Sequence, residues 1–171
     1  MSAAAPPDQA PPSAAVMAAI ARTAVSTRAR LAAEGRRTGS WEPGLSGECV
    51  RASFALRDAL RAAGQDARVR AGYFEVDMPD PETCLCGSLE GHPRSCRFVP
   101  HAWVETGGCV ADVTADQFNG LCFGGRFGPA EVLPIDEALR QRWRARLPAG
   151  VRGSSLNGGW RAGEVREFKP A

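Results

Sequence analysis

The sequence predicts an α+β domain in which a helix packs on a small antiparallel sheet. Between residues 13 and 63, apolar residues recur at the spacing of helices with one buried face. Between residues 67 and 114, short segments rich in β-branched and aromatic residues take over, two of them joined by a Gly-Gly turn. Helices followed by strands are typical of an α+β layout rather than an alternating one.

The helical part begins after a lead-in rich in alanine and proline. Residues 1–12 are rich in Ala and Pro, so we expect them to be a disordered lead-in. Ser13 can cap a first helix that continues to about Glu34. A Gly-rich loop over residues 35–47 follows, and a second helix is expected over residues 48–63, with Gly64 ending it.

The strands follow this second helix. We expect strands over residues 67–76, 98–106 and 109–114, with Gly107-Gly108 as the turn between the last two. A long insertion over residues 77–97 separates the first strand from the second.

The rest of the chain is expected to close the domain. A short turn or helix is expected around residues 116–119, and a helix over residues 129–147. Arginines alternate along that last helix around Trp143, which predicts a solvated helix surface: Arg140, Arg142, Arg144 and Arg146. Residues 13–147 are therefore expected to form a single domain, and residues 148–171 an extended tail.

Composition excludes several classes of protein. The chain has 171 residues, of which 44% are hydrophobic and 23% charged, with a formal net charge of +2. This composition argues against a disordered chain. The small net charge argues against electrostatic binding of nucleic acid or anionic lipid. No apolar run reaches the roughly 18–20 residues that cross a bilayer. Six cysteines are too few for a disulfide scaffold, so we expect a cytoplasmic protein with reduced thiols. From the balanced charge and the short apolar runs, we expect no nucleic-acid or membrane partner.

Cys49 is the first candidate for chemistry. It stands after a Gly-rich loop, at the first turn of the second helix. The unpaired N–H groups and the positive end of the helix dipole stabilise a thiolate there, and they can also bind an oxyanion. The alternative is a small buried cysteine on the apolar face of that helix.

His101 and Asp112 favour the catalytic alternative. A two-residue turn at Gly107-Gly108 places Thr106 opposite Cys109, so that His101 and Asp112 become diagonal neighbours on one face of the hairpin. The carboxylate can then fix the tautomer of the imidazole. Cys109 points to the opposite, apolar face, which leaves Cys49 as the nucleophile. Taken singly, the histidine is also explained as a structural residue and the aspartate as a strand-end cap.

These residues resemble a known family, the transglutaminase-like branch of the papain-like cysteine protease superfamily. The resemblance covers about residues 41–120 and is carried by Cys49, Ser53, Leu56, Leu60 and Gly64, by Ala71-Gly72, by His101-Ala102-Trp103-Val104-Glu105, and by Asp112-Val113-Thr114 with Gln117-Phe118. The chain is most similar to small bacterial members such as the leader peptidases of lasso-peptide maturation. The resemblance implies a papain-like core, with Cys49 as nucleophile, His101 as general acid and base, and Asp112 as orienting acid.

One feature departs from papain-like peptidases, which place a glutamine before the nucleophile as an oxyanion donor. Residues 35–48 contain neither Gln nor Asn. The candidates for the second donor are the Trp41 indole and the Ser46 hydroxyl. Trp103, beside the histidine, is either core packing or a wall of the cleft in contact with substrate.

The insertion holds a candidate metal site. Cys84, Cys86, His92 and Cys96 form a C-x-C-x5-H-x3-C pattern, and three thiolates with one imidazole are a tetrahedral zinc set. A structural zinc could order a loop that has no core of its own. Because C-x-C is a poorer zinc signature than C-x-x-C, a surface loop with free thiols is the alternative.

The leading functional prediction is a thiol-dependent acyl-transfer enzyme with a Cys-His-Asp triad and no cofactor required for catalysis. Its substrate would be a peptide, a protein, or a small amide or thioester, and hydrolysis is favoured over transfer because water needs no second binding site. Two alternatives stay open. One is an amide-forming acyltransferase in small-molecule or peptide biosynthesis, and the other is an inactive zinc-knuckle module that binds proteins.

Overall fold

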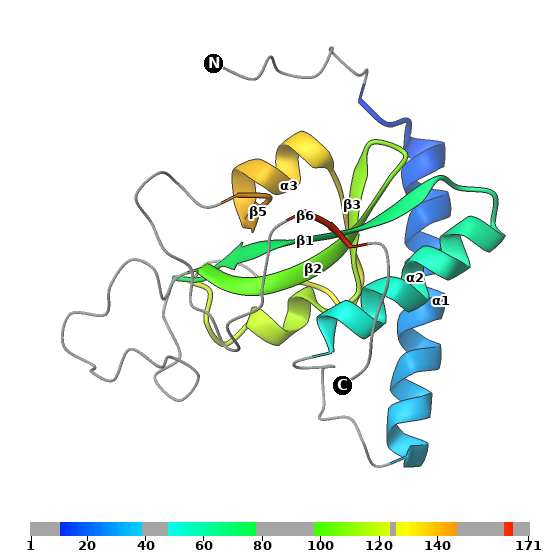
Figure 1. Cartoon of the computed structure of the whole chain (residues 1–171), viewed down its shortest axis with the longest axis horizontal. Helices are drawn as coiled ribbons and strands as arrows, with labels where there is room; N and C mark the ends of the chain where they lie inside the picture. Colours follow the sequence, from blue (N-terminus) through cyan, green and yellow to red (C-terminus); the bar gives the residue numbers. More distant parts are fainter. Residues whose placement is uncertain (1–10, 39–47, 78–97, 124–125, 147–162, 166–171) are drawn as a thin grey trace.

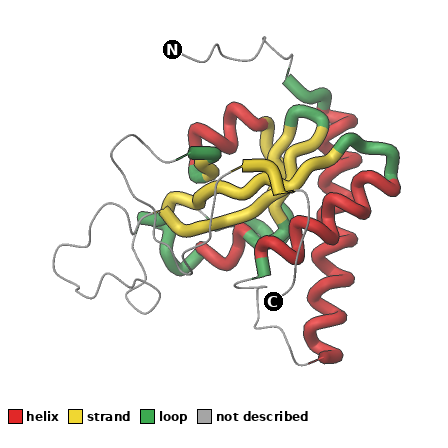
Figure 2. The backbone as a smooth tube through the Cα atoms, in the orientation of Figure 1, coloured by secondary structure: helices red, strands yellow, loops and turns green. Residues whose placement is uncertain are grey.

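The computed structural model describes residues 11–38, 48–77, 98–123, 126–146 and 163–165. Within these ranges the chain is an α+β protein, as the sequence predicts, with a central antiparallel sheet and helices packed around it (Figure 1, Figure 2). The predicted lead-in and insertion, and most of the predicted tail, lie outside the described residues.

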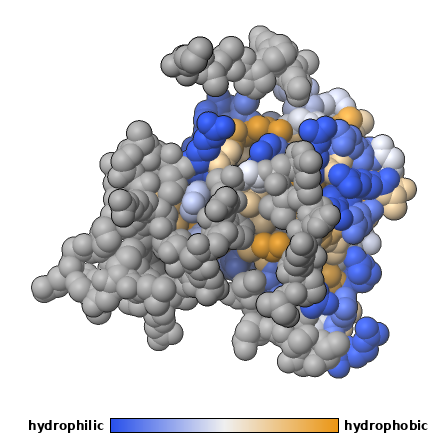
Figure 3. Space-filling model, viewed as in Figure 1, coloured by the Kyte–Doolittle hydropathy of each residue, from blue (hydrophilic) through white to orange (hydrophobic). Residues whose placement is uncertain are grey.

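Two helices cover one face of the sheet. Helix α1 (Ala14–Thr38) begins where predicted, because the Ser13 hydroxyl accepts a hydrogen bond from the N–H of Val16 at 3.3 Å. It continues past Glu34 and packs against α2 (Cys49–Ala62), which in turn packs on the sheet. Figure 3 shows hydrophilic residues gathered where Figure 1 places the outward side of α1. Gly64, at φ +81°, ends α2 as predicted.

The predicted hairpin forms in the predicted register. Strands β1 (Ala67–Glu75), β2 (Phe98–Thr106) and β3 (Cys109–Asp112) run antiparallel, and Thr106 pairs with Cys109. Gly107 and Gly108 both have positive φ, +54° and +76°, as a two-residue turn of the I′ type requires. The hairpin therefore places His101 and Asp112 on the same face.

The predicted helix over residues 129–147 is wrong. The segment divides into strand β4 (Glu131–Pro134), helix α3 (Ile135–Gln141) and strand β5 (Trp143–Arg144). Proline restricts the residue before it to extended conformations, so the chain pairs with β3 up to Pro134 and turns helical only afterwards. At the other end, α3 stops at Gln141 and the chain pairs with β1 through Trp143 and Arg144.

Two of the arginines assigned to a solvated helix surface are in fact held in ion pairs. Arg142 binds the carboxylate of Asp77 through both guanidinium Nη atoms, at 2.8 and 2.6 Å, and Arg144 binds Glu75 at 2.6 Å. Both acidic partners lie at the end of β1 or just after it. Arg140 lies in α3, as a helix predicts, whereas Arg142 and Arg144 follow the end of that helix and bind the end of β1.

The described strands form a six-stranded sheet in the order β4-β3-β2-β1-β5, and β6 (Gly163–Val165) also pairs with β1. Ahead of β4, the predicted turn near residues 116–119 is a short 3-10 helix, η2 (Ala115–Phe118).

The sheet separates two apolar cores. The first contains residues of α1 and α2 together with alternate residues of the hairpin, including Ala102, Val104 and Cys109. The second lies on the other face, and half of its buried residues are aromatic: Phe74, Trp103, Phe118 and Trp143 with Val76, Val110, Ala115 and Ala138. His101 and Asp112 project into this second, aromatic side.

Candidate active site

A buried imidazole–carboxylate pair is the centre of the candidate site. Nε2 of His101 lies 2.6 Å from Oδ2 of Asp112, and both side chains are excluded from solvent. Because an ionised carboxylate only accepts hydrogen bonds, Nε2 carries the proton. The hairpin register therefore produces the contact that the sequence predicts between these two residues.

The carboxylate of Asp112 is bound on both oxygens. Oδ1 accepts hydrogen bonds from the backbone N–H of Thr114 at 2.8 Å and from its hydroxyl at 3.0 Å. Oδ2 accepts from the indole N–H of Trp143 at 3.0 Å in addition to His101. Four donors compensate the loss of hydration that burial of a charge entails.

Burial and pairing act in opposite directions on the two pKa values. Burial by itself would lower the pKa of His101, whereas the charge of Asp112, their hydrogen bond and the nearby Cys49 thiol raise it, to about 10. Burial would likewise raise the pKa of Asp112, but His101, Thr114 and Trp143 hold it below its usual value. The pair is therefore an imidazolium and a carboxylate at neutral pH.

Cys49 lies close enough to the imidazole to interact with it. It is the first residue of α2 and is half-buried at the edge of the first core. Its thiol is near enough to contribute to the raised pKa of His101. Nδ1 of His101, the nitrogen not bound to Asp112, makes no hydrogen bond within the part of the chain that the structure describes. This nitrogen is thus available to exchange a proton with the thiol.

The start of α2 provides donors for a developing oxyanion. The first N–H groups of a helix have no acceptor within it, and the side chain of Glu48, the N-cap residue, makes no capping hydrogen bond. These groups lie at the end of α2 that begins with Cys49, as expected from the sequence. The two candidates for a second donor, Trp41 and Ser46, lie outside the described residues.

Trp103 belongs to the packed interior. It is completely buried in the aromatic core, and its ring lies over Gly72. A Cβ atom at position 72 would come within 2.3 Å of the Trp103 ring, so only glycine permits this approach. Of the two roles considered for Trp103, the structure shows the core-packing one.

Aromatic rings enclose the imidazole. Phe74 and Phe118 stack with their centroids 4.1 Å apart, and each presents its ring to His101 at a steep angle, 85° and 83°. These rings exclude water from the His101–Asp112 contact, which strengthens the interaction between the two charges. They also hold the imidazole in one orientation.

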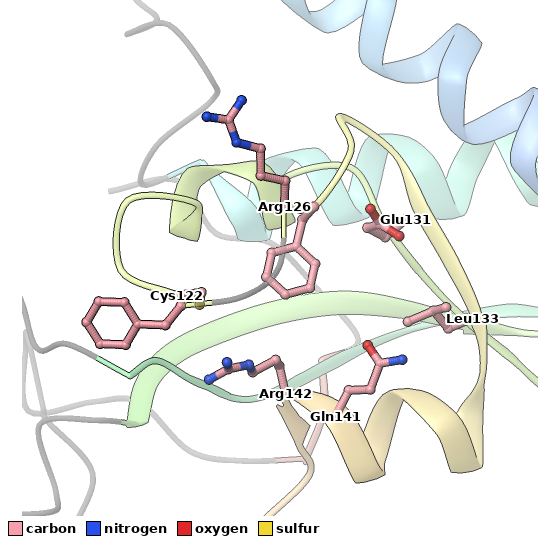
Figure 4. A pocket seen from close by; sticks show the side chains of 8 residues that line it. Cys122, Arg126, Glu131, Leu133, Gln141 and Arg142 are labelled. Carbon is pink, nitrogen blue, oxygen red and sulfur yellow. The ribbon is translucent and has the colours of Figure 1, made fainter.

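The other two described cysteines, Cys109 and Cys122, do not belong to the candidate triad of Cys49, His101 and Asp112. Cys109 is buried in the first core, as predicted, and burial raises the pKa of its thiol. Cys122 is half-buried in a pocket of about 440 Å³, in which Gln141 and Arg142 enter from the end of α3 (Figure 4). None of the three triad residues lines this pocket, which borders the aromatic core through Phe127.

The candidate zinc ligands Cys84, Cys86, His92 and Cys96 lie outside the described residues. Among the residues that are described, no group of three or more His, Cys, Asp or Glu side chains could hold a metal ion. In the same ranges, no helix is both long and apolar enough to cross a membrane.

Sequence reasoning missed Trp143 as a member of the site. The residue lies in the segment predicted as the last helix, and a partner 31 positions earlier in the chain leaves no local signal. Thr114 was recognised only through the Asp-Val-Thr resemblance, although a threonine two residues after an aspartate is a common local hydrogen-bond partner.

Comparison with known proteins does not extend this description: no family model, no curated protein and no solved structure matches the chain.

Proposed function

We propose that the protein is a thiol-dependent acyl-transfer enzyme in which Cys49, His101 and Asp112 form the catalytic triad. The observation that carries the proposal is the His101 ring, which is bound to Asp112 through Nε2, keeps Nδ1 without a described partner, and is near enough to the Cys49 thiol to interact with it. This division of the two ring nitrogens is what a general acid and base needs. The order of the three residues, on a helix start and two strands, agrees with the transglutaminase-like resemblance, and we propose a papain-like core.

The chemistry follows from the placement of the proton. The proton of the Cys49 thiol resides on Nδ1 of the His101 imidazolium, and the thiolate sulfur attacks the carbonyl carbon of an amide or thioester. The first N–H groups of α2 bind the oxygen that becomes negative. When the carbon–nitrogen or carbon–sulfur bond breaks, the imidazolium returns its proton to the leaving group, and an acyl-Cys49 intermediate remains.

Water or an amine then removes the acyl group, with His101 acting as base. Hydrolysis is the reaction we propose, since it requires no second binding site. An amide-forming transferase would use the same three residues with an amine as acceptor. The substrate class is therefore a peptide, a protein, or a small amide or thioester.

A small activated ester tests the proposal without knowledge of the natural substrate. With p-nitrophenyl acetate, we expect a burst of p-nitrophenol and one acetyl group on Cys49, identified by mass spectrometry of the digested protein. C49S and H101Q should abolish the burst. C122A, which removes another half-buried thiol, should retain it. Acetylation that is equal at Cys122 and Cys49, or absent from Cys49, would refute the proposal and favour an inactive binding module.

A further inference from the structure

Strand β5 brings a tryptophan into contact with the buried carboxylate. Trp143 pairs with Phe74 of β1, is completely buried, and directs its indole N–H at Oδ2 of Asp112. This is the oxygen that also accepts the hydrogen bond from His101. The indole is therefore in a position to affect how the carboxylate holds the imidazole.

The neighbours of Trp143 fix its position from both sides. Arg142 forms its two-pronged ion pair with Asp77 and also donates to the carbonyl oxygen of Glu75 at 3.1 Å. Arg144 binds the carboxylate of Glu75. A strand of only two residues is thus anchored to the end of β1 by charge-assisted hydrogen bonds, and these leave the indole little freedom to move.

We propose that Trp143 is a positioning residue for Asp112: its indole N–H holds Oδ2, while Thr114 holds Oδ1, so that the buried carboxylate stays ionised and aimed at His101. The consequence for catalysis rests on the proposed function. The hydrogen bond and its effect on the carboxylate do not, and they can be measured in a protein with no activity at all.

The physical argument concerns one charge and its donors. A buried carboxylate must be compensated, and each donor that binds the ionised form favours that form over the neutral acid. The indole N–H lowers the pKa of Asp112 in this way. Removing the N–H should make the carboxyl group take up a proton at higher pH, which breaks the ion pair with His101.

Other titratable or charged groups surround Asp112 and must be considered in any titration. They are His101 on β2, Cys49 on α2, Asp116 on η2 with its ion-pair partner Arg28 on α1, and Glu131, which pairs with Asp112 across β3 and β4. None of them is altered by replacing Trp143, so a change seen in that variant is assigned to the indole.

The test compares two tryptophan variants. W143F removes the N–H that binds Asp112. W103F removes an indole N–H from the same aromatic core that has no hydrogen-bond partner within the described part of the chain. The carboxyl carbon of Asp112 is followed by NMR as the pH is lowered. We expect its titration to move to higher pH in W143F and to stay at its wild-type position in W103F.

Alkylation of Cys49 by iodoacetamide provides a second readout. Relative to wild type, the ratio of the rate at acid pH to the rate at pH 7 should fall about 10-fold in W143F, because a hydrogen bond to a charge contributes about that factor. If Trp143 had only a structural role, W143F would lower the alkylation rates of Cys49 at acid pH and at pH 7 by the same factor. If Cys49 is unreactive in the wild type, the proposed function fails while the carboxyl titration still decides the present inference.

The wild-type protein offers a measurement that needs no variant to fold. The chain has four tryptophans, so its indole N–H signals are few enough to assign. The Trp143 signal should shift as Asp112 is protonated, and the Trp103 signal should follow that transition much less. A Trp143 signal that is insensitive to this protonation, or an Asp112 titration unchanged in W143F, would overturn the proposal.

Discussion

At the scale of single residues, Asp112 decides how the site behaves. Its two oxygens accept four hydrogen bonds, and its charge raises the pKa of a histidine that burial alone would keep neutral. A buried ion pair of this kind contributes less to stability than its geometry suggests, because both charges lose hydration. Losing one partner, however, leaves the other charge buried and unpaired.

Replacing Asp112 should therefore be costly. Because donors bind both oxygens, the amide NH₂ group in D112N must face a donor on one side. We expect a loss of about 3–5 kcal/mol in the free energy of unfolding, and a pKa of His101 well below the wild-type value. Urea denaturation and NMR titration of the imidazole measure the two effects.

The exposed pair of Arg68 and Asp66 provides the control for this variant. With 77% of the Asp66 side chain accessible to solvent, D66N should cost at most about 1 kcal/mol. Equal losses of unfolding free energy in D112N and D66N would contradict the claim that the buried charge of Asp112 depends on its four hydrogen-bond donors.

The contact between His101 and Asp112 could be predicted from the sequence, but the contact between Trp143 and Asp112 could not. Two glycines between alternating segments determine the turn, and the turn determines which residues share a face. Trp143 reaches the same carboxylate from a segment that pairs with β1 only in the folded protein. The spacing of residues within 129–147 does not indicate that Trp143 pairs with β1.

At the scale of elements, the predicted register of the β2–β3 hairpin is confirmed, whereas the predicted helix over residues 129–147 is wrong. The register of β2 and β3 follows from the two-residue Gly107-Gly108 turn, which is a strong local signal. The last segment contains a strand of four residues, a helix of seven and a strand of two. Elements this short are stabilised by their tertiary contacts rather than by their own sequence pattern.

The contact between β1 and β5 makes a specific prediction. A Cβ atom at Gly72 would lie 2.3 Å from the Trp103 ring and 2.5 Å from the carbonyl oxygen of Arg144. G72A should therefore destabilise the protein by about 1–3 kcal/mol or more, because neither a packed ring nor a backbone oxygen can yield easily. Thermal unfolding measures the loss.

Gly120 is the matched control for G72A. A Cβ atom there would meet nothing within 4 Å, and its backbone does not require glycine. G120A should leave the melting temperature almost unchanged or raise it slightly. Similar melting temperatures for G72A and G120A would contradict the close approach of β1 and β5.

At the scale of the whole molecule, the sheet is packed on both faces and the site lies where the two sides meet. Helix α2, which packs on the first core, begins with Cys49, the proposed nucleophile, and the aromatic core encloses His101 and Asp112. The overall α+β arrangement could be predicted from periodicity alone. The division into two cores could not, because it depends on β4, α3 and β5.

Folding stability should depend on pH through the buried pair. The pKa of His101 is raised from 6.5 to about 10 on folding, so the stability that this residue contributes is complete below pH 6.5 and is lost as the pH rises through 10. The loss approaches about 1.4 kcal/mol per pH unit within that window. Asp112, whose pKa is lowered, contributes stability that disappears as the pH falls below its ordinary value of 3.8.

Denaturation of wild type and H101Q across this range tests the dependence. H101Q should be less stable than wild type at pH 6 and should lose the decline between pH 6.5 and 10. Parallel curves for wild type and H101Q would mean that His101 is not charged in the folded protein.

The most direct test of the triad is the relative reactivity of its cysteine. Cys49, Cys109 and Cys122 are alkylated together by iodoacetamide at pH 7, and each rate is read by mass spectrometry within one protein sample. The His101–Asp112 pair should make Cys49 the fastest of the three, and H101Q should remove this advantage without changing the rate at Cys122. A Cys49 that reacts no faster than Cys122, or equally fast in H101Q, would contradict activation of the thiol by the buried pair.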